Sequence, residues 1–179
     1  MRKMFLIILL VSLCFNLCFS ILKPKSDNVG AIVGRIYLET DKDWETMKAG
    51  KYYKVKVNLI NKKTNKETFV LSNKDGYYYF LNLEPGEYIL KSYRYKYQSG
   101  SWIFTLSANF GKNGIDLKVD PKQINAMKTI HFNVNIGGDQ KMEREENLDE
   151  LKDFFTSLDK NGTWSDFKWK YEGNGKKKK

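Results

Sequence analysis

The chain has 179 residues, enough for one domain with short appendages, and carries 31 Lys and Arg against 21 Asp and Glu, a formal net charge of +10. A domain near this size buries roughly 70% of the surface that its unfolded chain exposes, so it needs neither a metal ion nor disulfides to stabilise a core. The charge indicates either attraction to anionic partners or a solvated lysine-rich surface, and because no DNA- or RNA-binding motif accompanies it, we expect no nucleic-acid partner.

Residues 1–20 are typical of a secretory signal peptide, because a basic start precedes the apolar run MFLIILLVSLCFNLCF and Ser20 closes it. Cleavage after Ser20 would place a small residue at each of the two positions before the cleavage site that signal peptidase recognises. One alternative is lipidation of Cys18, although Leu17 stands where a bacterial lipobox usually has Gly, Ala or Ser. Another is an uncleaved anchor, because residues 4–22 nearly suffice to span a bilayer. We expect an exported protein of the periplasm, outer envelope or cell surface, either free or lipid-anchored.

Residues 21–29 are polar and predict a tether, and from Gly30 to residue 137 the hydrophobic period becomes two. The segments that we expect to form strands are 31–39, 51–62, 68–72, 77–83, 87–97, 102–110, 115–119 and 128–136. Turn sequences separate them, including NKDG, where Gly76 is free to take a positive φ. Seven or eight short strands at this spacing predict an all-β fold, an antiparallel sandwich.

Beyond residue 137 the composition changes. Residues 138–162 predict a linker and an amphipathic helix, with acidic residues in its first turns and Gly162 as its C-cap. Its apolar stripe, which we expect to pack on the sandwich, consists of Leu148, Leu151, Phe155 and Leu158. Residues 163–179 form an aromatic segment and a basic tail, and the aromatic residues Phe167, Trp169 and Tyr171 alternate as in a strand.

The residue inventory argues against an enzyme. Cys14 and Cys18 are the two cysteines, and both lie in the signal segment, so its removal leaves no disulfide, thiol nucleophile or cysteine metal site. His131 is the one histidine, too few for a zinc carboxypeptidase site, and no recognisable nucleophile motif is present. The segment DKNGTWSD, residues 159–166, lacks the ligand spacing of a calcium-binding EF-hand loop. We therefore expect no catalytic residues, no cofactor and no metal site.

The segment NKDGYYYFLNLEPGEYIL, residues 73–90, resembles the signature of carboxypeptidase-regulatory-like and Cna-B-type domains, which are transthyretin-like (prealbumin-like, Ig-like) sandwiches. The matching residues are Asp75, Gly76, Tyr78, Phe80, Leu83, Pro85, Gly86, Tyr88 and Leu90. The resemblance covers about residues 30–137 and implies a fold rather than an activity. Some Cna-B domains form a Lys–Asn isopeptide bond, which we do not expect here, because the first strand has Arg35 in place of a lysine and a guanidinium stays protonated.

The resemblance also implies a register for the tyrosine-rich stretch. It points Tyr78 and Phe80 into the core opposite Tyr88 and Leu90, so strand alternation turns Tyr77 and Tyr79 outward. The same alternation beyond Leu90 would turn outward Tyr93, Tyr95 and Tyr97, beside Lys91. Arg94 and Lys96 would then point inward, so either a β-bulge changes the register or the strand extends beyond the core.

The outward tyrosines have two interpretations. They form either a cross-strand ladder that stabilises the sheet or, with Lys91, an aromatic platform that binds a protein or a glycan. The sequence as a whole indicates an exported, non-enzymatic module of the cell envelope with a binding or structural role. The alternatives are an accessory domain that serves a catalytic partner on another chain, and a membrane-tethered lipoprotein adhesin.

Overall fold

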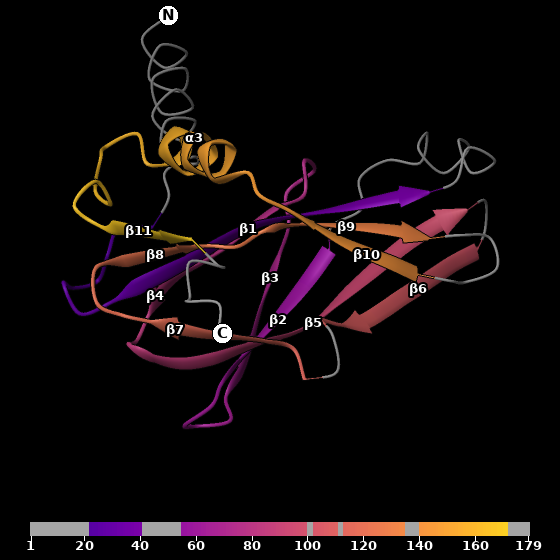
Figure 1. The fold of residues 1–179 in the computed structure, drawn as a ribbon, viewed down its shortest axis with the longest axis horizontal. Coiled ribbons are helices and arrows are strands. Elements are labelled where there is room, and N and C mark those ends of the chain that lie inside the picture. Colours follow the sequence, from indigo (N-terminus) through magenta and orange to yellow (C-terminus); the bar gives the residue numbers. More distant parts are fainter. Residues whose placement is uncertain (1–21, 41–54, 100–101, 111–112, 135–139, 172–179) are drawn as a thin grey trace, which may run out of the picture.

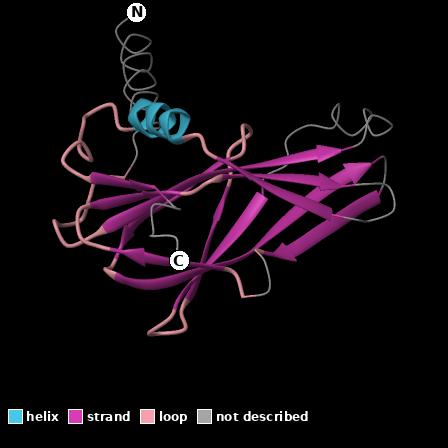
Figure 2. Ribbon diagram, in the orientation of Figure 1, coloured by secondary structure: helices cyan, strands magenta, loops and turns pink. Residues whose placement is uncertain are grey.

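The structure is a computed structural model that describes residues 22–40, 55–99, 102–110, 113–134 and 140–171. Within these ranges the chain forms eleven strands and one helix. The strands form two sheets that face each other, and the helix lies over the outer side of one sheet (Figures 1 and 2). The all-β, two-sheet architecture with an appended helix agrees with the sequence. The predicted signal segment, including Cys18, and the basic tail beyond Tyr171 lie outside the described residues.

The first sheet contains six strands in the order β10-β9-β1-β8-β11, with β4 also paired to β1. Their bounds are β1 Gly30–Thr40, β4 Tyr77–Leu83, β8 Gln123–Ala126, β9 Thr129–Val134, β10 Gln140–Glu145 and β11 Lys168–Tyr171. Three of the pairings, β1 with β8, β1 with β9 and β8 with β11, are parallel. The sheet is therefore mixed, whereas the sequence predicted an antiparallel one. A parallel pair needs a long crossover, and here the whole second sheet separates β1 from β8 in the sequence.

The second sheet is antiparallel throughout its described pairs, with strand order β3-β2-β5-β6 and β7 paired to β5. Its strands are β2 Val55–Asn61, β3 Glu67–Leu71, β5 Gly86–Ser99, β6 Trp102–Asn109 and β7 Ile115–Val119. Strand β5 is long enough to pair with β7 along its first part and with β6 along its second part.

The central core lies between the two sheets. Tyr78, Phe80, Tyr88 and Leu90 are all buried there, as the motif register predicted, while Leu83 is only partly buried at its margin. Gly34 of β1 faces the Tyr78 ring so closely that a Cβ would overlap it, so a glycine at this position makes room for the tyrosine. Gly76 takes the positive φ of +85° that the NKDG turn predicted.

A second core lies on the outer side of the first sheet, beneath the helix α3, Leu148–Leu158. Leu151 and Phe155 of the predicted apolar stripe are buried in it, and Leu148 and Leu158 are partly buried. The aromatic segment after the helix completes this core with Trp164, Phe167 and Tyr171. The helix therefore packs on the sandwich as expected. No helix in the described ranges has the length and apolar character needed to cross a membrane.

Two expectations for the C-terminal region were wrong. Residues 140–145, QKMERE, are strand β10 paired with β9 rather than linker or helix. Pairing with a free sheet edge here overrides a sequence with good helix formers, because propensity is a weak local preference. The helix also ends before Gly162: Asp159 follows it, and its carboxylate accepts hydrogen bonds from the backbone N–H groups of Thr163 at 2.9 Å and Trp164 at 2.7 Å.

Candidate functional site

A β-bulge in β5 determines which side chains the second sheet presents on its outer side. Leu59 of β2 pairs with Leu90, but the preceding Asn58 pairs with Ser92, so Lys91 is the extra residue in β5. The Lys91 carbonyl accepts a hydrogen bond from the Phe110 backbone N–H at 3.0 Å. A bulge of this kind reverses the side of the sheet to which each following side chain points, compared with strict alternation.

Polar side chains gather on the outer side of the second sheet, directly after this bulge. They line a pocket of about 260 Å³ and come from β2, β5 and β6: Asn58, Ser92, Arg94, Ser107 and Asn109, with Tyr93 at its floor. The strand register brings them together, because Ser92 lies opposite both Asn58 and Asn109, and Arg94 lies opposite Ser107.

Asn58 is the most buried polar residue of the pocket. It is 9% exposed, and its Nδ2 donates a hydrogen bond of 2.8 Å to the Ser92 Oγ. Its Oδ1 has no hydrogen-bond partner among the described residues. A buried polar atom without a partner costs about 1–3 kcal/mol, so a hydrogen-bond donor that enters the pocket, from a water molecule or from a ligand, would stabilise this oxygen.

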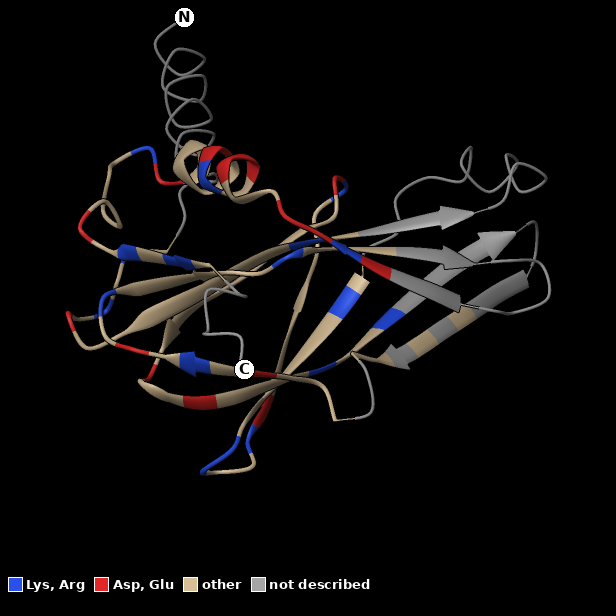
Figure 3. Ribbon diagram, viewed as in Figure 1, with Lys and Arg blue, Asp and Glu red and all other residues tan. Residues whose placement is uncertain are grey.

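The pocket is cationic. Arg94 is exposed on this side, and no Asp or Glu is among the described residues that line the pocket. Figure 3 shows blue segments side by side on β2 and β5, where the register pairs Lys56 with Arg94. The Lys56 Nζ lies 3.9 Å from the ring centroid of Phe69 on β3, and Phe69 is 54% exposed. The outer side of the second sheet therefore combines two cations with a partly exposed aromatic ring.

Tyr93 supports the pocket from below. It is 1% exposed, and its ring packs against Phe110 with 5.5 Å between the ring centroids. Burial raises the pKa of the Tyr93 hydroxyl well above its usual range, so this group stays neutral at physiological pH. Tyr93 therefore does not face outward, as strict alternation had predicted. The predicted alternative, a bulge that changes the register, is confirmed.

The predicted tyrosine face is not one surface. Tyr77 and Tyr79 lie on β4 of the first sheet, partly buried in the second core, whereas Lys91 and Tyr93 lie on β5 of the other sheet. The ring of Tyr77 stacks on Phe154 of α3, with 4.0 Å between ring centroids and 8° between planes. Lys91 is exposed at the bulge. The side chains of Tyr95 and Tyr97 fall outside the described part of the chain, so their predicted outward direction stays a prediction.

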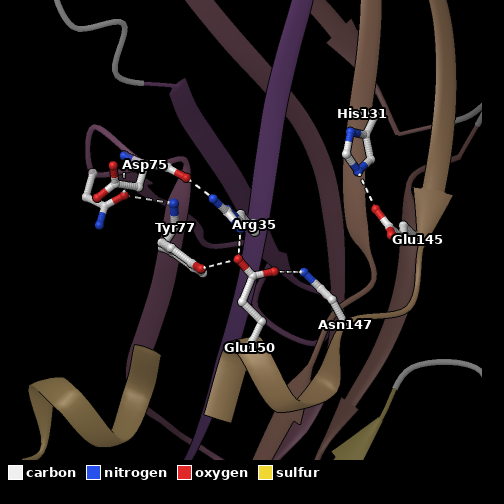
Figure 4. A network of polar contacts seen from close by, with 8 residues as sticks. Arg35, Asp75, Tyr77, His131, Glu145, Asn147 and Glu150 are labelled. Atoms are coloured by element: carbon white, nitrogen blue, oxygen red, sulfur yellow. Dashed lines mark hydrogen bonds and ion pairs between the residues drawn. The ribbon is translucent and has the colours of Figure 1, made fainter. Parts of the chain in front are cut away.

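Polar contacts attach α3 to the first sheet at the Arg35 position. Arg35 donates a hydrogen bond of 2.9 Å from its Nε to the Asp75 carbonyl and forms an ion pair with Glu150. Figure 4 shows Arg35, Tyr77 and Asn147 converging on the Glu150 carboxylate, which accepts hydrogen bonds of 2.7 Å from Tyr77 and 2.9 Å from Asn147. Arg35 therefore helps to attach the helix to the first sheet.

His131 lies apart from the polar pocket, on β9 of the first sheet. Its Nε2 lies 2.9 Å from the Glu145 Oε2 on the neighbouring strand β10 (Figure 4). The Glu145 side chain is largely exposed, so this pair joins two strands at the surface.

A larger cavity of about 520 Å³ lies where the N-terminal segment meets the turn after β4, and Lys25, Asn28, Asn82 and Glu84 are among the residues that line it. The Asn82 side chain is already bonded there, since its Oδ1 accepts a hydrogen bond from the Lys25 N–H and its Nδ2 donates one to the Lys23 carbonyl. We therefore favour the pocket on the second sheet, where a buried amide oxygen has no partner.

Sequence reasoning missed the pocket residues. The alternation in KVKVNLI did place Lys56 and Asn58 on the side of the strand away from the core. It did not indicate that these two residues lie next to Arg94 in the folded protein. Ser107 and Asn109 are unremarkable polar residues of a short strand. The available signal was the conflict at Arg94, which strict alternation would have buried.

No protein-family model and no curated protein matches the sequence. Among solved structures, the chain is similar to a leucine-rich repeat protein from Bacteroides thetaiotaomicron VPI-5482, with 17% identity and a TM-score of 0.35. The similarity covers 59% of this chain but 14% of the other, so this chain spans a small part of that protein's length. A likeness of this size supports no statement about fold or function.

Proposed function

We propose that this chain is an exported, non-enzymatic β-sandwich module of the cell envelope that binds an envelope or surface ligand through the polar pocket. The unpartnered Oδ1 of the buried Asn58 carries the proposal, because it marks a place where a ligand would satisfy a group that the described chain leaves unsatisfied. The signal-like residues 1–20 support export. The pairing of His131 with Glu145 at the surface supports a non-catalytic role for the one histidine.

We assign the sandwich to the transthyretin-like class. The motif of residues 73–90 supports this assignment, together with the burial of its inward positions Tyr78, Phe80, Tyr88 and Leu90. Modules of this class are attached to many different activities, so the function rests on the pocket rather than on the fold.

The double variant Asn58→Leu/Ser92→Ala tests the binding role. It removes both partners of one hydrogen bond together with the unsatisfied oxygen, so we expect the free energy of unfolding to change by no more than about 1 kcal/mol. We expect wild type, but not this variant, to be retained on immobilised fractions of cell-envelope protein or polysaccharide. The control Asn161→Leu/Thr68→Ala changes exposed residues outside the pocket and should be retained like wild type. Equal retention of the pocket variant would contradict the proposal.

A second candidate, the membrane-tethered lipoprotein, is favoured by how the N-terminal segment is attached. Trp164 Nε1 donates a hydrogen bond of 3.0 Å to the Leu22 carbonyl, and Asn82 holds Lys23 and Lys25. With lipid on Cys18, three residues would separate the anchor from Leu22 and hold the body at the membrane surface. The intact mass of the mature protein decides: an added diacylglyceryl group on Cys18 supports tethering, and a chain that begins after Ser20 excludes it.

A further inference from the structure

We infer that the ligand of the polar pocket is an acidic saccharide whose carboxylate, sulfate or phosphate group is bound by Arg94. This inference rests on the proposed binding function and names its ligand class. The first argument is charge. Arg94 is exposed and forms none of the ion pairs in the described part of the chain, and the pocket lining contains no carboxylate to neutralise it.

A guanidinium in this position suits an anionic group. Arginine presents a planar set of donors that binds the two oxygens of such a group together, and hydrogen bonds between charged groups are the stronger ones. Lys56, the register partner of Arg94, adds a second positive charge on the same side of the sheet. An uncharged ligand would leave these two positive charges without a negatively charged partner.

The second argument is the set of neutral polar groups around Arg94. Two amides and two hydroxyls, those of Asn58, Asn109, Ser92 and Ser107, line the same pocket. Amide and hydroxyl side chains both donate and accept hydrogen bonds, as the hydroxyl groups of a sugar do. The free Oδ1 of Asn58 provides an acceptor that an anionic group by itself could not satisfy, because a fully ionised anion has no proton to donate.

The third argument is the size of the pocket and the aromatic ring that lies next to it. The pocket of about 260 Å³ is smaller than the roughly 300–1,000 Å³ typical of sites for drug-sized ligands, so it suits one sugar ring rather than a folded partner. Phe69 lies directly across β2 from Ser92, opposite Asn58, and offers a half-exposed ring to a neighbouring sugar. An acidic peptide would also meet Arg94, but its backbone could not add to β5 at the pocket, because β5 is already paired there with β2 on one side and with β6 on the other.

The test is binding of the folded protein to an array of neutral, uronic-acid, sulfated and phosphorylated glycans together with acidic peptides. We expect retention of acidic glycans. We expect Arg94→Gln to weaken it by roughly tenfold to a hundredfold, the range for a hydrogen bond to a charged group. Arg94→Lys should restore part of the affinity because it keeps the charge but not the planar donor set. The control Lys66→Gln removes an equal charge from an exposed turn and should bind like wild type.

Each other outcome contradicts the inference. Retention of neutral glycans alone that Asn58→Leu/Ser92→Ala abolishes would leave the binding function standing and refute the acidic ligand. Retention of acidic peptides instead would refute the saccharide class. Equal losses for Arg94→Gln and Lys66→Gln would show that net charge, and not this pocket, accounts for binding. Absence of any retention would refute the saccharide ligand.

Discussion

At the scale of single residues, Lys91 determines what lies on each side of the second sheet. As the extra residue of a bulge, it places Tyr93 in the central core and Ser92 and Arg94 in the pocket. Strict alternation from Leu90 would have done the reverse and buried a guanidinium, which is costly without a partner. The bulge therefore serves both the core and the candidate site.

Tyr93 and Lys91 should respond very differently to truncation. Tyr93→Ala removes a buried ring packed on Phe110, so we expect a loss of about 3–5 kcal/mol in the free energy of unfolding, as for other large aromatic truncations in cores. Lys91→Ala changes an exposed side chain and should stay within about 0.5 kcal/mol of wild type. Urea unfolding measures both, and a small effect of Tyr93→Ala would mean that Tyr93 faces solvent after all.

At the scale of elements, α3 is attached to the first sheet by apolar and polar contacts. Phe155 packs edge-on against Trp164 and Trp169, at centroid distances of 5.9 and 5.6 Å. At the margin, Glu150 accepts hydrogen bonds from Tyr77 and Asn147 and pairs with Arg35, whose guanidinium also lies 4.4 Å from the Tyr77 ring centroid. Tyr77 and Tyr79 of β4 thus form part of the surface on which the helix packs.

Glu150→Ala should weaken this attachment. The change leaves Arg35, whose side chain is 14% exposed, without its carboxylate, so we expect a loss of about 1–3 kcal/mol in stability. Asp153→Ala in the same helix removes the same charge from an exposed position and should cost at most about 0.5 kcal/mol. Thermal unfolding of the two variants under identical conditions makes the comparison. Equal stabilities would mean that the polar contacts do not help to hold the helix.

At the scale of the whole molecule, the predicted tether is part of the folded body. Residues 22–29 are held by hydrogen bonds with Trp164 of the C-terminal segment and with Asn82 near the end of β4. The Lys122 backbone N–H donates a further hydrogen bond to the Val29 carbonyl. Segments far apart in the sequence therefore meet where the described chain begins. A binding site on the second sheet would therefore keep a defined position relative to residue 22, where the described chain begins.

Asn82→Gly tests whether this segment is fixed. Asn82 has a φ of +56°, which glycine adopts freely, so the change removes the side-chain hydrogen bonds without backbone strain. We expect trypsin to cleave after Lys25 faster than in wild type, with little change in the melting temperature. The matched control is Asn65→Gly, at φ +53° in the turn between β2 and β3, which should leave this cleavage rate unchanged. Equal rates in all three proteins would mean that Asn82 does not hold the segment.

Much of the fold could be predicted because it depends on local patterns. Strands β4 and β7 have the bounds that alternation predicted, and the stripe of α3 follows from helical spacing. The inward positions Tyr78, Phe80, Tyr88 and Leu90 are likewise buried. These features follow from the sequence because alternation and helical period fix which side of an element is apolar, whatever lies opposite.

Tertiary structure alone decided the rest. Gln140–Glu145 became a strand because β9 offered an edge. Strands β8 and β9 pair parallel with β1, which is possible because the strands of the second sheet separate them from β1 in the sequence. The outward side of β4 is covered because α3 packs on it. The candidate site depends on the bulge at Lys91, which no local property of that residue marks. A shift of one residue in register exchanges the two faces of a strand, so the pocket exists only through the pairing of β5 with its neighbours.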